Sequence, residues 1–264
     1  MALLPSLLRK AGIKSSVKSQ LVLDGKTLDV TLKHNSRARR IILRIDKQGD
    51  GLVLTLPNGT SLGDAMEFAA SQGAWIGQQL AKQPKRAKFA EGQHIPVRGV
   101  SHLVVVATGK RTPVWCETAA QNHNRDDAAG ENILGENILY VSGDEKHHPR
   151  RIQDWLKKQA RSDLTRAAFE YAEKMDSTVR RISIRDTSSR WGSCSSNGAL
   201  SFSWRLILAP PFVLDYVAAH EVAHLTEMNH SAQFWALVNH HCLATGAAKK
   251  WLKANGRSLH RYGL

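Results

Sequence analysis

The sequence lacks the features of a disulfide-stabilised or membrane-spanning protein. It has only 3 cysteines in 264 residues, and this odd number of widely spaced thiols favours a reducing compartment. The longest apolar stretch, 200–219, is interrupted by two charged residues and two prolines, so no membrane span is expected. The apolar residues near the N-terminus are followed at once by Arg9 and Lys10, without a small-residue cleavage site. We therefore expect a soluble, cytoplasmic protein.

Acidic residues are also scarce. The chain has 23 Asp and Glu against 37 Lys and Arg, a net charge of +14. Such an excess favours polyanionic partners, namely nucleic acid, nucleotides or an acidic protein surface, although a generally basic protein would show it too. No helix-turn-helix, zinc-finger or aromatic RNA-binding signature accompanies the charge. A polyanion interaction is therefore an open expectation.

Alternation of apolar and polar residues predicts strands in the first half of the chain. The pattern indicates strands within 20–57, and a helix that begins near Ser61. Strand patterns return at 93–106 and 112–116. We therefore predict a small β-rich N-terminal subdomain over residues 1–118.

The second half of the chain is predicted to contain a polar linker followed by both helices and strands. Residues 119–150 carry 3 basic and 6 acidic side chains, and we predict that they form a polar linker or loop. Apolar residues spaced three or four apart predict a long amphipathic helix over 151–175. Two strands and three further helices are expected downstream, within a domain at 151–264. The predicted fold class is α+β.

The clearest chemical signal is the segment His220-Glu221-Val222-Ala223-His224, which is an H-E-x-x-H pattern on a predicted helix. Histidines four residues apart share one face of a helix, so both imidazoles can bind one Zn²⁺ ion at about 2.0–2.1 Å. Glu221 lies to the side of that face, where it can reach a water on the metal without being a ligand. We predict Glu221 as the catalytic residue.

A third histidine completes the predicted metal site. His230 follows His224 after five intervening residues, which is enough for the helix to end and the chain to turn back. Asn229 tolerates the left-handed backbone that such a turn can need. Three histidines with an open fourth position are typical of catalytic zinc. The alternative is a core helix with two satisfied histidines and a surface His230.

A wider set of residues resembles a known family signature. The segments are Arg190–Ser195, Asn197-Gly198, Trp204–Ile207, Pro210, Leu214–Val217, His220–Leu225, Asn229–Ser231 and Phe234-Trp235. Together they resemble the YgjP-like predicted zinc metallopeptidases, a family related to the SprT-like and WLM zincins. The resemblance implies a zincin-like catalytic domain at 151–264, with the H-E-x-x-H segment on its active-site helix. It extends to the β-rich part from Arg40 to Val106, whereas segment 117–147 is longer than expected for the family.

Other polar residues near the motif leave alternatives open. Tyr216 shares a helix face with His220, and it is either a donor to an oxyanion or a core tyrosine. Asp215 either orients a histidine or caps a helix. Arg190 and Arg205 either bind an anionic group of a substrate or form structural ion pairs.

Two further residues are interpreted as structural. Cys194 has no adjacent base marked in the sequence, so we interpret it as a strand or turn residue near the metal and not as a nucleophile. Glu227 is interpreted as an exposed turn residue, in preference to an acceptor for a ligand imidazole.

The leading hypothesis is a zinc-dependent metallopeptidase with Glu221 as general base for a metal-activated water. Its partner is then a peptide or protein substrate, paired by strand addition with the strand after Asn197. Two alternatives stay open. One is metal-dependent hydrolysis of nucleotides or phosphoanhydrides, and the other is a nucleic-acid-associated protease or binding protein. No membrane partner is expected, and the sequence does not predict an oligomeric state.

Overall fold

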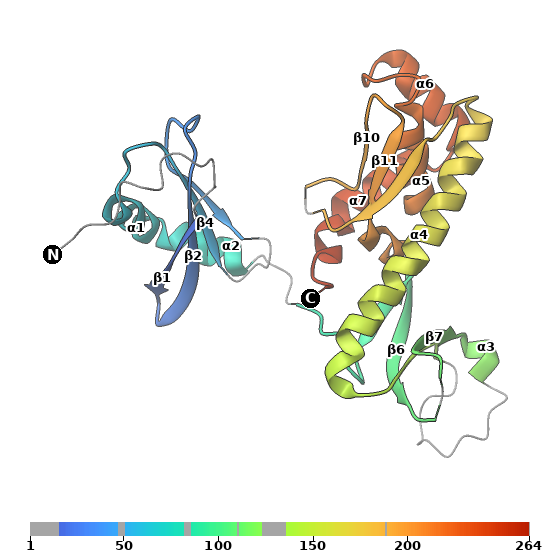
Figure 1. Ribbon diagram of the computed structural model, residues 1–264, viewed down its shortest axis with the longest axis horizontal. Helices are drawn as coiled ribbons and strands as arrows, with labels where there is room; N and C mark the ends of the chain where they lie inside the picture. Colours follow the sequence, from blue (N-terminus) through green and yellow to red (C-terminus); the bar gives the residue numbers. More distant parts are fainter. Residues whose placement is uncertain are drawn as a thin grey trace. The chain divides into compact units, whose positions relative to one another are not determined.

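The chain folds into two compact units, Met1–Pro84 and Lys85–Leu264. The computed structural model describes residues 16–46, 51–81, 86–109, 111–122, 136–187 and 189–263 (Figure 1). Strands and helices occur in both units, which confirms the α+β class. Among the described helices, none combines the length and hydropathy that crossing a bilayer requires.

Unit 1 contains a four-stranded sheet. Its strands are β1 (Ser16–Leu23), β2 (Lys26–His34), β3 (Ile42–Ile45) and β4 (Leu52–Leu56), in the order β1-β2-β4-β3. The first two form a hairpin whose turn, Asp24-Gly25, has φ values of 49° and 74°. Two successive left-handed residues give a turn whose twist matches that of the flanking strands.

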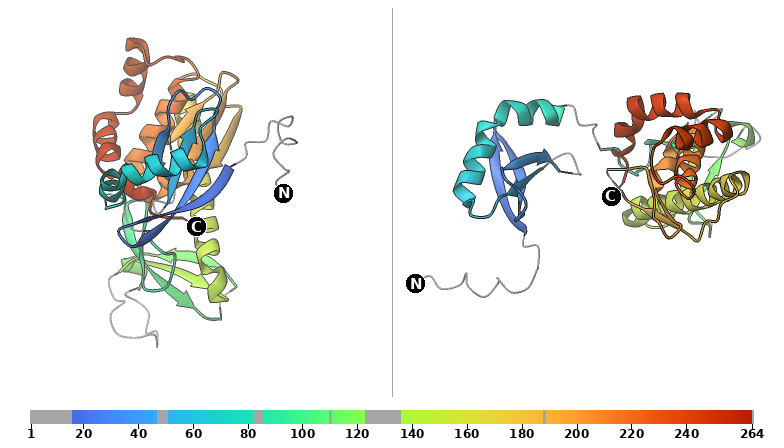
Figure 2. Two further views of the ribbon diagram at one scale, coloured as in Figure 1. Left: turned by 90° about the vertical axis from the view of Figure 1, so that its left-hand side faces the viewer. Right: turned by 90° about the horizontal axis from the view of Figure 1, so that it is seen from above.

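Two helices pack on one face of this sheet (Figure 2). They are α1 (Leu62–Ser71) and α2 (Gly73–Ala81). Ser61 caps α1 by accepting a hydrogen bond from the amide of Asp64, whose side chain accepts one from the Ser61 amide in return. Alternate residues of the central strands, such as Leu32 and Leu54, are fully buried beneath the helices.

Unit 2 has a second four-stranded sheet, a three-stranded sheet and several helices. The four-stranded sheet contains β5 (His94–Val97), β6 (Val100–Ala107), β7 (Val114–Glu117) and β8 (Ile138–Ser142), in the order β5-β6-β8-β7. The three-stranded sheet contains β9 (Arg181–Arg185), β10 (Gly192–Cys194) and β11 (Ala199–Ser203), in the order β10-β11-β9. The helices are α3 (Ala119–Asn122), η1 (Glu145–His147), α4 (His148–Lys174), η2 (Trp204–Leu208), α5 (Pro211–Ala223), α6 (Ala232–His241) and α7 (Thr245–Leu259).

Helix α4 connects the two sheets of unit 2. It runs along the unit, with β6 and β7 at one end and β10 and β11 at the other (Figure 1). The predicted long helix over 151–175 is thereby confirmed, with a start at His148 where Pro149 enters the first turn. Its buried residues Ile152 and Leu156 share a core with Val104 of β6 and Leu139 of β8.

This packing gives a different division of the chain from the predicted boundary at residue 118. Strands β5–β8 belong with the C-terminal half, because their apolar faces are buried against α4. The predicted linker at 119–150 contains β8, in which four of the five residues are buried. Residues 123–135 of that segment lie outside the described part of the chain.

Candidate metal centre

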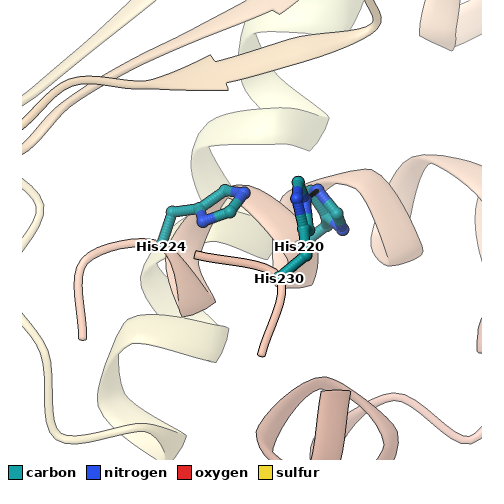
Figure 3. A group of neighbouring side chains, drawn as sticks. All are labelled: His220, His224 and His230. Carbon is teal, nitrogen blue, oxygen red and sulfur yellow. Dashed lines mark hydrogen bonds between the residues drawn. The ribbon is translucent and has the colours of Figure 1, made fainter. Parts of the chain in front are cut away.

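Two helix ends bring the predicted histidines together. His220 lies in the last turn of α5, and His224 is the capping residue of that helix. His230 directly precedes Ser231, which caps α6 by accepting a hydrogen bond from the amide of Phe234 at 3.2 Å. Figure 3 shows the three imidazoles converging from the end of α5 and from the loop before α6.

The spacing of the rings suits one metal ion. Each histidine offers a ring nitrogen, and these atoms all lie within 4.8 Å of one another. The Nε2 atoms of His220 and His230 are 3.1 Å apart. Two ligands at about 2.0–2.1 Å from a tetrahedral ion are separated by roughly 3.3 Å, so this pair is already near coordination geometry.

The protonation of the rings also suits a metal. Nδ1 of His224 lies 3.0 Å from the carbonyl oxygen of Glu227. A carbonyl only accepts, so Nδ1 carries the proton and Nε2 keeps its lone pair. Burial lowers the pKa of His220 to about 4, assisted by the charges of His224 and His230. Neutral imidazoles suit zinc, copper, iron and nickel, and the donor set therefore fits a metal ion.

The loop between His224 and His230 differs from its prediction in two details. Asn229 does not have a left-handed backbone, since the positive φ values outside glycine occur at Asp24, Arg98 and Asp176 in the described ranges. The loop instead starts with backbone hydrogen bonds, including that from the Glu227 amide to the Ala223 carbonyl at 2.9 Å. Glu227 is thus a turn residue whose main chain, and not its side chain, orients a ligand imidazole.

Two aromatic residues of α6 hold the imidazoles, a role that the sequence did not reveal. Phe234 stacks on His224 with ring centroids 4.5 Å apart. Trp235 stacks on His230 at 5.7 Å. In the sequence, both residues appeared only as part of the family signature, because the approach of α6 to the end of α5 is a tertiary feature. These contacts restrict the ring orientations and lower the entropic cost of binding an ion.

Glu221 lies beside the histidines under strand β10. It is 6% exposed, and burial raises the pKa of its carboxyl to about 7, partly offset by the charge of Arg190. A β-carbon on Gly192 would lie 2.5 Å from both Cγ and Oε1 of Glu221. The sequence motif at 190–195 therefore contains glycine where the strand backbone and the carboxylate approach most closely.

The charged residues near the motif have different surroundings in the structure. Arg205 pairs with Asp186 and donates from Nε to the carbonyl of Tyr262 at 3.1 Å, so it is a structural ion pair. Arg190 is exposed and contributes its charge to the surroundings of Glu221. Asp215 lines a cavity of about 130 Å³ with Arg98, Asp163 and Arg166 among others, and none of the three clustered histidines lines it.

Tyr216 and Cys194 have structural surroundings. Tyr216 belongs to the main core of unit 2 at 7% exposure, and its ring centroid is 5.8 Å from that of His220. Cys194 is the last residue of β10, as its interpretation as a strand residue predicted. Burial, together with the charge of Glu221, raises the pKa of its thiol to about 11, which keeps it protonated and weakly nucleophilic at neutral pH.

The sequence and the structure were compared with known protein families and solved structures. Residues 39–255 match the YgjP-like metallopeptidase domain. The chain belongs to the YgjP-like family. Among solved structures, the crystal structure of the metallopeptidase zymogen of Pyrococcus abyssi abylysin is similar with a TM-score of 0.33 and 18% sequence identity, covering 38% of this chain and 99% of that chain. The search of curated proteins returns no match.

The YgjP-like match extends beyond the histidine site. It begins in unit 1, shortly before β3, and ends within α7. The family resemblance of the β-rich part, expected from Arg40 onward, is thereby confirmed. Both units contribute to the matched domain, so unit 1 is not an unrelated addition.

Proposed function

We propose that this YgjP-like protein is a zinc-dependent metallopeptidase with a zincin-like active site. The observation that carries the proposal is the convergence of three imidazoles beside a buried carboxylate that is not part of their cluster. A zinc ion bound by His220, His224 and His230 would supply an acidified water and a positive charge that polarises the scissile carbonyl.

The protein's own groups would then perform the proton transfers. Glu221 accepts a proton on a carboxylate oxygen and later delivers it to the amine that leaves. The buried position of Glu221 under Gly192 keeps this carboxylate in one place between the two transfers. The carbonyl of Glu227 holds His224 in the tautomer that binds metal.

The edge of a strand supports a peptide as the substrate, but it is not the strand that the sequence indicated. Strand β11, which follows Asn197, pairs with β10 on one side and β9 on the other, so it offers no edge for strand addition. Among the described strands, β10 pairs with β11 alone, so its other edge is free, and it contains Gly192 beside Glu221. An extended peptide paired with β10 would lie next to the proposed base.

A substrate screen tests this function. We expect the purified protein to contain zinc and to cleave members of a peptide library, with loss of activity on chelation and recovery on adding zinc. The same preparation is offered a panel of nucleotides. Peptide cleavage should depend weakly on salt, unlike binding to a polyanion. Zinc-dependent hydrolysis of nucleotides without any peptide cleavage would refute the peptidase proposal while leaving the metal site intact.

Gly192 provides a separate prediction for the base. Gly192→Ala should lower the rate on a cleaved peptide by about 100-fold, because the added methyl displaces the carboxylate of Glu221 or strand β10. Zinc content should stay near the wild-type value, since the three atoms nearest to the added β-carbon all belong to Glu221 and not to a histidine. Gly246→Ala in α7 is the matched control, because its added β-carbon would meet no atom within 4 Å. Equal rates for both variants would show that this close approach does not position the base.

A further inference from the structure

Strand β3 forms one edge of the sheet in unit 1, and it borders a groove. In the order β1-β2-β4-β3, it pairs with β4 alone among the described strands. The groove has a volume of about 710 Å³ and lies well away in sequence from the histidine site. Its lining residues are Arg40, Ile41, Ile42, Leu43, Arg44, Phe68, Gln72 and Trp75.

The groove follows the free edge of β3 and not one of its faces. Five consecutive residues line it, and successive side chains of a strand point to opposite faces of the sheet. Ile41 and Leu43 pack against the core of unit 1. Within β3, Ile42 and Arg44 alternate with Leu43 and therefore belong to the other face, and Arg40 lies in the bend just before the strand. Only a groove along the edge itself contacts both sets.

An edge strand presents backbone N–H and C=O groups that have no partner strand. A polypeptide in extended conformation satisfies them by adding a strand, and the groove leaves room for one. Trp75 is 39% exposed at its rim, and Phe68 is half-buried on the same side. An added strand would therefore meet apolar surface on its helix-facing side.

The opposite side of the groove is basic. Arg40 and Arg44 are both exposed. No ion pair joins either arginine to a carboxylate of the described residues. Arg44 lies on β3, where it stands beside alternate side chains of a neighbouring strand. Arg40 lines the same groove two residues before Ile42. Acidic side chains at those positions would complement them.

We propose that the β3 edge binds an extended polypeptide segment in which acidic and apolar side chains alternate. The segment adds to the four-stranded sheet, with its acidic side chains beside Arg40 and Arg44 and its apolar side chains toward Phe68 and Trp75. The free backbone edge favours a polypeptide over a nucleic acid, because phosphates and bases do not continue a β-sheet. This site shares no residue with the metal centre, and its occupancy does not require the proposed peptidase activity.

Fluorescence anisotropy on the full-length protein tests the proposal. The probe is a fluorescein-labelled peptide that alternates Glu and Val over about eight residues, a usual strand length. We expect saturable binding that weakens at least about tenfold in the Arg40→Glu, Arg44→Glu double variant. Lys18→Glu is the matched control, because Lys18 is an exposed cation on β1 at the opposite edge of the sheet, and it should bind like the wild type.

Two N-methylated forms of the probe distinguish strand addition from charge attraction alone. A strand added at a sheet edge uses the N–H groups of alternate residues, namely those that face the sheet. The form methylated at these amides should therefore not bind, whereas the form methylated at the amides that face away should still bind. Equal binding of both forms would overturn the proposal. It would also be overturned if the probe did not bind, or if a single-stranded oligothymidine bound through the same two arginines and displaced the probe.

Discussion

Replacement of Glu221 by Gln should remove most hydrolytic activity while the metal stays bound. Gln keeps the size of the side chain and its reach, but it cannot accept the proton. Loss of a general base typically costs about 10²–10⁴ in rate, and we expect at least the lower value on a peptide identified by the library screen. Zinc content, measured by atomic emission, should equal that of the wild type because Glu221 is not among the clustered ligand groups.

The Glu221→Gln variant should also fold. Its position is buried beneath Gly192, and a neutral amide of equal size removes the cost of burying a charge there. Circular dichroism and the unfolding midpoint check this point. Retention of both zinc and full activity would refute the assignment of Glu221 as base. Loss of zinc from a folded variant would instead make the carboxylate a ligand and contradict the three-histidine set.

Single substitutions of His220, His224 or His230 by Ala should each reduce zinc affinity by more than about 100-fold. Removing a partner that only orients a ligand already costs about 10–100-fold, and each of these changes removes a ligand itself. The rings share one cluster with ligand atoms within 4.8 Å of one another, so two remaining imidazoles cannot complete a tetrahedral site. Zinc affinity is measured by competition with a chromophoric chelator.

His240→Ala is the control for these three variants. His240 is an exposed residue in the last turn of α6, and its ring contacts that of His241. We expect its zinc affinity to match the wild type, so that a general effect of losing a surface histidine is separated from loss of a ligand. Stoichiometric, tightly bound zinc in all three site variants would refute the metal centre.

The family and the chemical groups of the candidate site were accessible from the sequence. The spacing of His220 and His224 is a local property of one helix, in which residues four apart share a face. A short loop then limits how far His230 can lie from them. Periodicity also predicted the long helix that became α4 and the α+β class, because patterns of 3.6 and 2 residues depend only on which face of each element is buried.

The boundary between the two units could not be predicted from the sequence in the same way. Strands β5–β7 precede the acidic segment, and composition alone grouped them with the strands of unit 1. Their apolar residues could be buried against either half of the chain, and the sequence pattern is the same in both cases. In the structure these strands pack against α4, so they belong to unit 2, and the boundary between the units lies between Pro84 and Lys85.

The sequence by itself determined which residues can bind a metal and which carboxylate stands beside them, because these depend on spacing within one helix and one loop. Only the tertiary structure decided that Gly192 lies against Glu221, that β10 is an edge strand of its sheet while β11 is the central one, and that Phe234 and Trp235 stack on the ligand rings. Each of these contacts joins elements that are distant along the chain. Their approach results from burial of a shared apolar core, which constrains the whole unit and not any one segment.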